Sequence, residues 1–187
     1  MFQQKGEIRL AADSSKVKLG PAKVTFDVDG TPVEFEATQG GVVLNYTITT
    51  REVNIDQYGT TPIKEIITGH QASIEVPFAE YDLAKLNAII PGAVLVGSGS
   101  SRRVDIDASA VTDLLDRAKK VIITPLFSDD PEDIVTLYKA APVPQLNYTY
   151  SYENEWITNV TFKAYPDADG NLIAFGDPDA TDEEEEG

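Results

Sequence analysis

The chain has 187 residues, no cysteine, 42% hydrophobic residues and a formal net charge of −16 at pH 7. This length and composition are typical of one globular domain with a full hydrophobic core. The absence of cysteine excludes disulfides, thiolate metal sites and cysteine nucleophiles. The acidic balance disfavours adhesive binding to nucleic acid, because phosphates would be repelled. Since no apolar run reaches membrane-spanning length and the first ten residues lack a signal-peptide core, we expect cytosolic synthesis and no membrane insertion.

The first predicted element is a hairpin over residues 24–37, where apolar and polar residues alternate on both sides of Asp29 and Gly30. Two β-type runs of about 15 residues each follow within residues 40–80, well above the usual strand length of ~5–6 residues. The connection Gly-Thr-Thr-Pro at residues 59–62 joins them. A hairpin this long is barely stable alone, so it requires a sheet from the rest of the chain or from neighbouring copies.

Alternation within the long runs predicts one apolar and one polar face. In the first run Leu44 and Ile48 share one parity and Val53 the other, which requires a bulge or bend near residues 50–52. In the second run, residues of one parity are apolar and would form a buried face, and residues of the other parity are polar and would form a solvent-exposed face. His70, the only histidine, falls on the apolar parity. We interpret it as a core or interface residue rather than a catalytic base.

A short helix is predicted over residues 81–90, where leucines and isoleucines recur at helical spacing before Pro91 and Gly92. The later predicted elements are strands near 94–96 and 103–107, a helical turn within 113–120, strands at 121–126 and 134–140, a hairpin over 146–164 that turns near 153–155, and a strand at 172–175. Residues 177–187 are acidic and lack an apolar anchor, so we expect disorder there. The predicted organisation is one mainly β domain, a β-sandwich or barrel, over residues 1–176.

No catalytic constellation stands out in the sequence. A single histidine excludes sites that need two, and no G-x-S-x-G motif is present. The glycine-rich stretch at residues 97–101 lacks the Lys-Ser/Thr ending of a phosphate loop. Residues 167–171 resemble part of a calcium loop without its later glutamate, and a turn explains them. We therefore expect no enzymatic activity, no cofactor and no metal.

The order of several short blocks within residues 40–93 resembles that of tail tube (major tail) proteins of long-tailed bacteriophages. The blocks are GGV at 40–42, DQYG-x-x-P at 56–62, IITG at 66–69, FAE at 78–80 and PGA at 91–93. The resemblance implies a small β-sandwich with one short flanking α-helix and a long β-hairpin that joins an oligomeric inner barrel. It also implies hexameric rings that stack into a hollow tail, with about four strands from each subunit in that barrel.

The function implied by the resemblance is that of a structural, self-assembling virion protein of the phage tail, assembled in the host cytoplasm. Its partners would be further copies of itself and other tail proteins: terminator, tip and tape measure. DNA would pass through without specific binding. A barrel of about 24 strands at ~4.8 Å spacing and ~40° tilt has a backbone diameter of about 48 Å and a lumen of about 38 Å. An acidic wall would repel DNA phosphates at close approach.

Three sets of residues are candidates for these roles. The polar parity of the long hairpin would line the lumen, and its members are Asn45, Thr47, Thr49, Glu65, Gln71, Ser73 and Glu75. The end of the hairpin would contact the next ring, through Asp56, Gln57, Tyr58, Gly59, Thr60, Thr61 and Pro62. Arg102 and Arg103 would meet a carboxylate on a neighbouring subunit.

Other functions remain open at this point. One is a different tail component, such as a terminator, and another is the related tube of type VI secretion systems. A third is a monomeric acidic β-sandwich binding module, with an aromatic groove around Tyr148, Tyr150 and Trp156.

Overall fold

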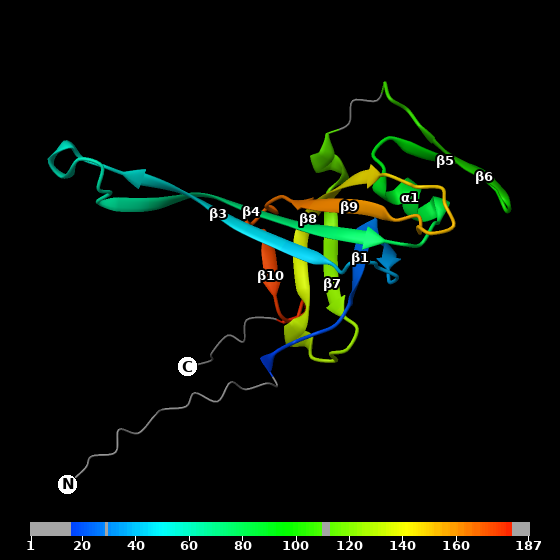
Figure 1. Ribbon diagram of the computed structural model, residues 1–187, viewed down its shortest axis with the longest axis horizontal. Coiled ribbons are helices and arrows are strands. Elements are labelled where there is room, and N and C mark those ends of the chain that lie inside the picture. The colour runs from blue at the N-terminus through cyan, green and yellow to red at the C-terminus, as the bar shows by residue number, and fades with distance from the viewer. Residues whose placement is uncertain (1–15, 29, 110–112, 181–187) are drawn as a thin grey trace, which may run out of the picture.

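One antiparallel sheet folds over on itself into two layers in the computed structural model, which describes residues 16–28, 30–109 and 113–180 (Figure 1). Its strand order is β2-β1-β7-β8-β9-β4-β3, with β10 paired to β8. The strands are β1 (Ala22–Val28), β2 (Thr31–Phe35), β3 (Val43–Val53), β4 (Lys64–Phe78), β7 (Lys119–Pro125), β8 (Val135–Leu146), β9 (Thr158–Ala164) and β10 (Ile173–Phe175).

Strand β8 belongs to both layers. Its first half pairs with β7 and β10, and from Ala140 to Leu146 it pairs with β9. One layer is therefore β2-β1-β7-β8-β10 and the other is β8-β9-β4-β3. Figure 1 shows the strands of the second layer running crosswise over those of the first. This arrangement is sandwich-like and confirms the predicted mainly β class.

Aromatic side chains join the two layers across the core. Phe26 of β1 packs on Phe162 of β9 with ring centroids 5.1 Å apart, and Phe35 of β2 packs on Phe78 of β4 at 4.8 Å. All four are buried, as is Ile74 on the inward parity of β4. Because side chains alternate across a strand, this parity of β4 supplies the core while the other faces away.

The helix α1 (Leu83–Ile89) lies beside a separate two-stranded hairpin of β5 (Ala93–Ser98) and β6 (Ser101–Ile106). The side chain of Asp82 caps the helix by accepting a hydrogen bond from the Ala84 N–H at 2.7 Å. Leu86 and Ile89 join the core cluster. The predicted helix is thus confirmed, over a shorter range.

Two predicted elements differ in the structure. Residues 147–157 are a loop between β8 and β9 rather than the ends of two hairpin strands, because their alternating aromatics pack on one another instead of on a sheet. The helical turn predicted within residues 113–120 is a 3-10 turn, Leu114–Arg117, before β7. In the acidic tail, where disorder is predicted, residues 177–180 form a turn. Residues 181–187 lie outside the described residues.

Candidate functional site

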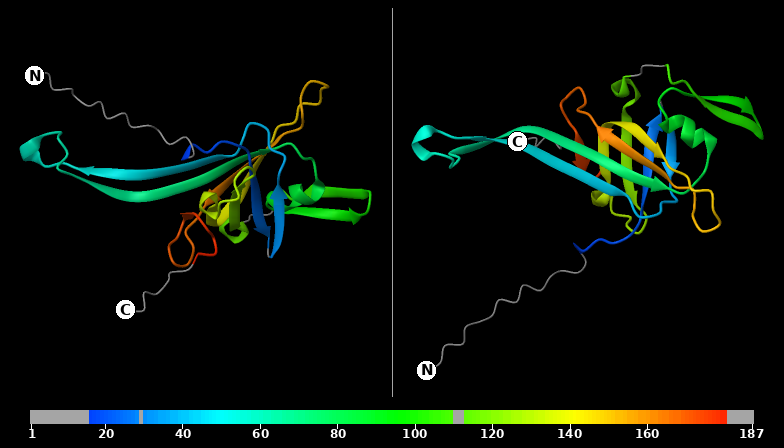
Figure 2. Two further views of the ribbon diagram at one scale, coloured as in Figure 1. Left: turned by 90° about the horizontal axis from the view of Figure 1, so that it is seen from below. Right: turned by 45° about the horizontal axis from the view of Figure 1, so that its top comes forward.

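The hairpin of β3 and β4 leaves the sandwich as a long two-stranded arm (Figures 1 and 2). Strand β9 supports β4 only from Ser73 to Phe78, and residues 64–71 of β4 pair with β3 alone in the described chain. At ~3.4 Å per residue this unsupported length is about 27 Å. We call residues 47–71 the arm and residues 54–63 its tip.

A β-bulge at Thr68 divides the arm. Thr49 pairs with Gly69 and Thr50 pairs with Ile67, so Thr68 is the extra residue. Its hydroxyl donates a hydrogen bond to the Thr49 carbonyl oxygen at 3.1 Å. The bulge expected near residues 50–52 is therefore present beside that segment, but its extra residue lies in the second strand of the hairpin.

The bulge puts Glu65 and Glu75 on opposite faces. Glu65 lies across from Glu52, and the Thr50 hydroxyl donates to Glu65 Oε1 at 2.6 Å. Glu75 instead accepts a hydrogen bond from Asn45 Nδ2 at 3.0 Å. The interpretation that both glutamates share the polar face is wrong, because one inserted residue reverses a period of two.

The other lumen candidates do share a face, directed away from the core. The register pairs Asn45 with Ser73 and Thr47 with Gln71, while Thr49 lies opposite Gly69. This polar face is not uniformly acidic. By the register it holds one acid, Glu75, and three bases in its described strands: Arg51, Lys64 and Lys163.

On the opposite face of the arm lie the positions of β3 and β4 whose alternation continues that of the buried core residues. Ile74 is buried, but farther out Tyr46, Ile48 and Ile67 are 46%, 44% and 57% exposed. His70 lies on this face, with its Nδ1 2.8 Å from the Tyr46 hydroxyl oxygen and the two rings stacked. His70 is exposed, so it is not a core residue.

The predicted inter-ring residues form the exposed tip of the arm. A 3-10 turn, Asp56–Tyr58, starts the tip, and Gly59 ends it with a φ of 62°, a backbone conformation that favours glycine. Tyr58 is 64% exposed. The tip therefore offers an aromatic side chain and a carboxylate well away from the sandwich.

Arg102 and Arg103 lie on β6, at the end of the molecule opposite the arm (Figures 1 and 2). Arg103 donates from Nε to both carboxylate oxygens of Asp105, at 2.9 and 3.1 Å, which raises the pKa of the guanidinium further. Both arginines border a groove of about 370 Å³. We call it the α1–β6 groove; its aliphatic lining is Leu83, Leu86, Ile90, Val104, Ile106 and Leu146.

An aromatic cluster forms part of the wall of this groove, through Tyr81 and Tyr148. The ring of Trp156 is 4.7 Å from that of Tyr150, 5.4 Å from Tyr81 and 6.0 Å from Tyr148. Tyr81 and Tyr150 meet Trp156 edge-on, so much of the indole is covered by its own neighbours. The sequence predicted an aromatic group here, but the contribution of Tyr81 from before α1 depends on the fold.

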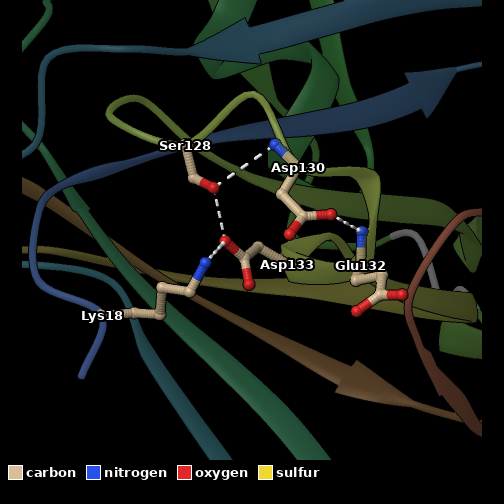
Figure 3. A network of polar contacts seen from close by, with 5 residues as sticks. All are labelled: Lys18, Ser128, Asp130, Glu132 and Asp133. Carbon is tan, nitrogen blue, oxygen red and sulfur yellow. Dashed lines mark hydrogen bonds and ion pairs between the residues drawn. The ribbon is translucent and has the colours of Figure 1, made fainter. Parts of the chain in front are cut away.

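The acidic turn after β7 has a structural role (Figure 3). Asp133 accepts hydrogen bonds from Lys18, at 2.8 Å, and from the Ser128 hydroxyl, and these contacts hold its pKa below the usual value. Asp130 accepts from the Glu132 N–H at 3.1 Å. Within residues 16–28, 30–109 and 113–180, no three acidic or histidine side chains converge to hold a metal ion. None of the helices described there has the length and apolar character to cross a bilayer.

No family model matches the chain, and no curated protein matches it. A chain in the six-fold symmetrised cryo-EM structure of the anti-feeding prophage baseplate is similar, with a TM-score of 0.43 and 14% identity. The match covers 86% of this chain and 92% of that chain. A TM-score this low does not establish a shared fold.

Proposed function

We propose that this chain is a structural subunit that self-assembles into rings through its arm, and that stacked rings form a phage tail tube. The observation that carries the proposal is the unsupported arm of about 27 Å. A two-stranded ribbon with no further neighbour is only marginally stable in water. An arm of this length therefore favours a fold that is completed by other copies of the chain.

The apolar face of the arm supports this proposal. This face continues the alternation that buries Ile74 in the core. Ile48 and Ile67 nevertheless lie on it about half exposed. Burying a side chain of this type contributes about 1.5–3 kcal/mol when it passes from full exposure to full burial. The outer edge of β3 is also unpaired in the described chain, and closing a barrel would remove that edge.

The second layer of the sandwich suits the wall of a tube. It supplies four strands, namely β3, β4, β9 and the second half of β8. Hexameric closure of such layers would give about 24 strands, a backbone diameter of about 48 Å and a lumen of about 38 Å. Its outward face, with Asn45, Thr47, Thr49, Gln71, Ser73 and Glu75, would line that lumen.

The mixed charge of this face changes the expected relation to DNA. With Lys163 on the same face as Glu75, close-range repulsion by an acidic wall is not part of the proposal. Arg51 and Lys64 add two more bases to this face, so a duplex would slide only where it stays clear of the wall. A Debye length of ~8 Å screens the wall charges from DNA on the axis of a wide lumen.

Electron microscopy of the purified protein across concentrations, with its mass in solution, tests the proposal. We expect hollow rings or tubes at high concentration. Tail tip and terminator proteins, the partners the proposal implies, would be added if the chain alone stays near its monomer mass of 20.3 kDa. A monomer that persists with and without these proteins would contradict self-assembly.

A second candidate function is a monomeric binding module. The aromatic cluster favours it, because Tyr150 is 74% exposed beside Trp156 and such rings can stack on sugars. The same experiment separates the two functions. A stable monomer whose Trp156 fluorescence shifts with an oligosaccharide would support the module.

A further inference from the structure

We infer that the end of the arm of one copy docks into the α1–β6 groove of a second copy. The contact would join Glu52 and Glu65 to Arg102, with Arg103 at the border of the groove and Ile67 on its apolar floor. The inference rests on the proposed self-assembly and names the contact that drives it.

The end of the arm carries an unrelieved pair of like charges. Glu52 lies directly across from Glu65 in the β3–β4 register, on the face that also carries Ile67. Like charges directly opposite each other destabilise an antiparallel pair. Among the described residues, Thr50 donates a hydrogen bond to Glu65, and no cation lies within ion-pair distance of either carboxylate. A partner that places a cation between the two carboxylates would relieve this repulsion.

The groove offers the complementary chemistry. Arg102 forms no ion pair with any described residue, and Arg103 uses Nε for Asp105 while its side chain stays 71% exposed. Guanidinium groups pair with carboxylates in a two-pronged geometry that is stronger than a neutral hydrogen bond. By strand alternation, Val104 and Ile106 share the Arg102 face of β6 and belong to the apolar floor of the groove, and Ile106 is 57% exposed. Arg103 and Asp105 lie on the opposite face of the strand.

The hairpin that bears the arginines packs against α1 but gains no support from a larger sheet. Strands β5 and β6 pair only with each other in the described chain, as a sheet separate from the sandwich. An isolated hairpin is marginally stable, so a partner on this surface would stabilise it.

The positions of the two surfaces require two copies. The arm and the β5–β6 hairpin extend from opposite ends of the molecule in every view (Figures 1 and 2), so an arm cannot reach its own groove. A contact between two different surfaces of identical chains is head-to-tail. Such contacts generate closed rings or open filaments, according to the rotation between copies.

Charge reversal tests the contact. Variant A is Glu52→Lys/Glu65→Lys, and variant B is Arg102→Glu/Arg103→Glu. Each alone should raise the concentration needed for assembly at least about tenfold, because like charges would then meet in the interface. An equimolar mixture of A and B should assemble again, since each arm then meets a groove of opposite charge. The matched control, Glu36→Lys/Glu153→Lys, changes net charge as A does on exposed acids outside the arm, and should assemble like wild type.

Cross-linking provides a second measurement that does not require complete rings. The chain has no cysteine, so Ile67→Cys and Ile106→Cys introduce single thiols at exposed positions. A mixture of the two should oxidise mainly to the mixed dimer. The docking contact would be overturned if wild type forms hollow assemblies, variants A and B assemble normally, and no mixed dimer is preferred. The proposed function would still hold in that case. A wild type that does not assemble, together with no preferred mixed dimer of the two cysteine variants, would overturn both.

Discussion

Glu65 and Glu75 lie on one strand at positions of the same parity, yet they face opposite sides of the arm. The bulged residue Thr68 between them is the cause. Glu75 stays on the polar face with Asn45, whereas Glu65 joins Glu52 on the face that continues the core. One inserted residue thus gives a single hairpin a polar surface and a charged docking end.

Two matched substitutions distinguish the role of the arm's apolar face in assembly from the role of the core in folding. Ile74 is fully buried, so Ile74→Asp would place a carboxylate in the core and should abolish folding. Ile48 lies farther out on the same face and is 44% exposed, so Ile48→Asp should fold normally but fail to assemble. Circular dichroism reports folding and electron microscopy reports assembly. Normal rings from Ile48→Asp would count against this face as an interface.

The packing of the two layers predicts a large loss of stability for Phe162→Ala. Phe162 contacts both Phe26 and Phe35, and its removal would leave a cavity between the layers. The expected loss in the free energy of unfolding is about 3–5 kcal/mol. Phe175→Ala is the control, because that ring is exposed and its loss should cost less than about 0.5 kcal/mol. Urea unfolding measures both, and equal losses would refute the role of Phe162 in joining the layers.

Acid should weaken the junction between β2 and α1. Hydrogen bonds from Lys85 and from the Ala37 N–H lower the pKa of Glu80 below its ordinary value of 4.5. Because the folded-state pKa is the lower one, the stability from Glu80 is present above pH 4.5 and is lost as the pH falls through the folded-state value. Wild type should therefore lose more thermal stability than Glu80→Gln over this acid range. Parallel curves of Tm against pH would contradict the prediction.

The lumen assignment predicts a gain of DNA retention in Glu75→Lys. The substitution changes an exposed side chain on the polar face, so folding and assembly should be unaffected. Tubes of this variant should hold duplex DNA at low salt and release it as salt rises, because each added phosphate contact steepens the salt dependence. Lys163→Glu is the control and should reduce retention. If neither variant differs from wild type in a DNA retention assay, this face does not line the lumen.

Much of the sandwich could be predicted from local patterns. The alternation around Asp29 and Gly30, the capped helix after Asp82 and the buried parity that includes Ile74 all correspond to elements of the structure. These features depend on residues near one another in the chain, where side-chain period and turn chemistry decide the outcome. The prediction of strands over residues 147–157 is wrong, because aromatic alternation has the same period whether the rings pack on a sheet or on each other.

The candidate site divides in the same way. The sequence by itself determined that a long hairpin exists, that one of its faces is apolar, and that its end and the Arg102-Arg103 pair are exposed polar features. Only the tertiary structure decided which strand holds the bulge, where β9 stops supporting β4, and that the arm and the arginines lie at opposite ends of the molecule. Strand register and the length over which β9 pairs with β4 depend on segments far apart in the chain. Alternation with a period of two does not show which strand contains the extra residue of a bulge.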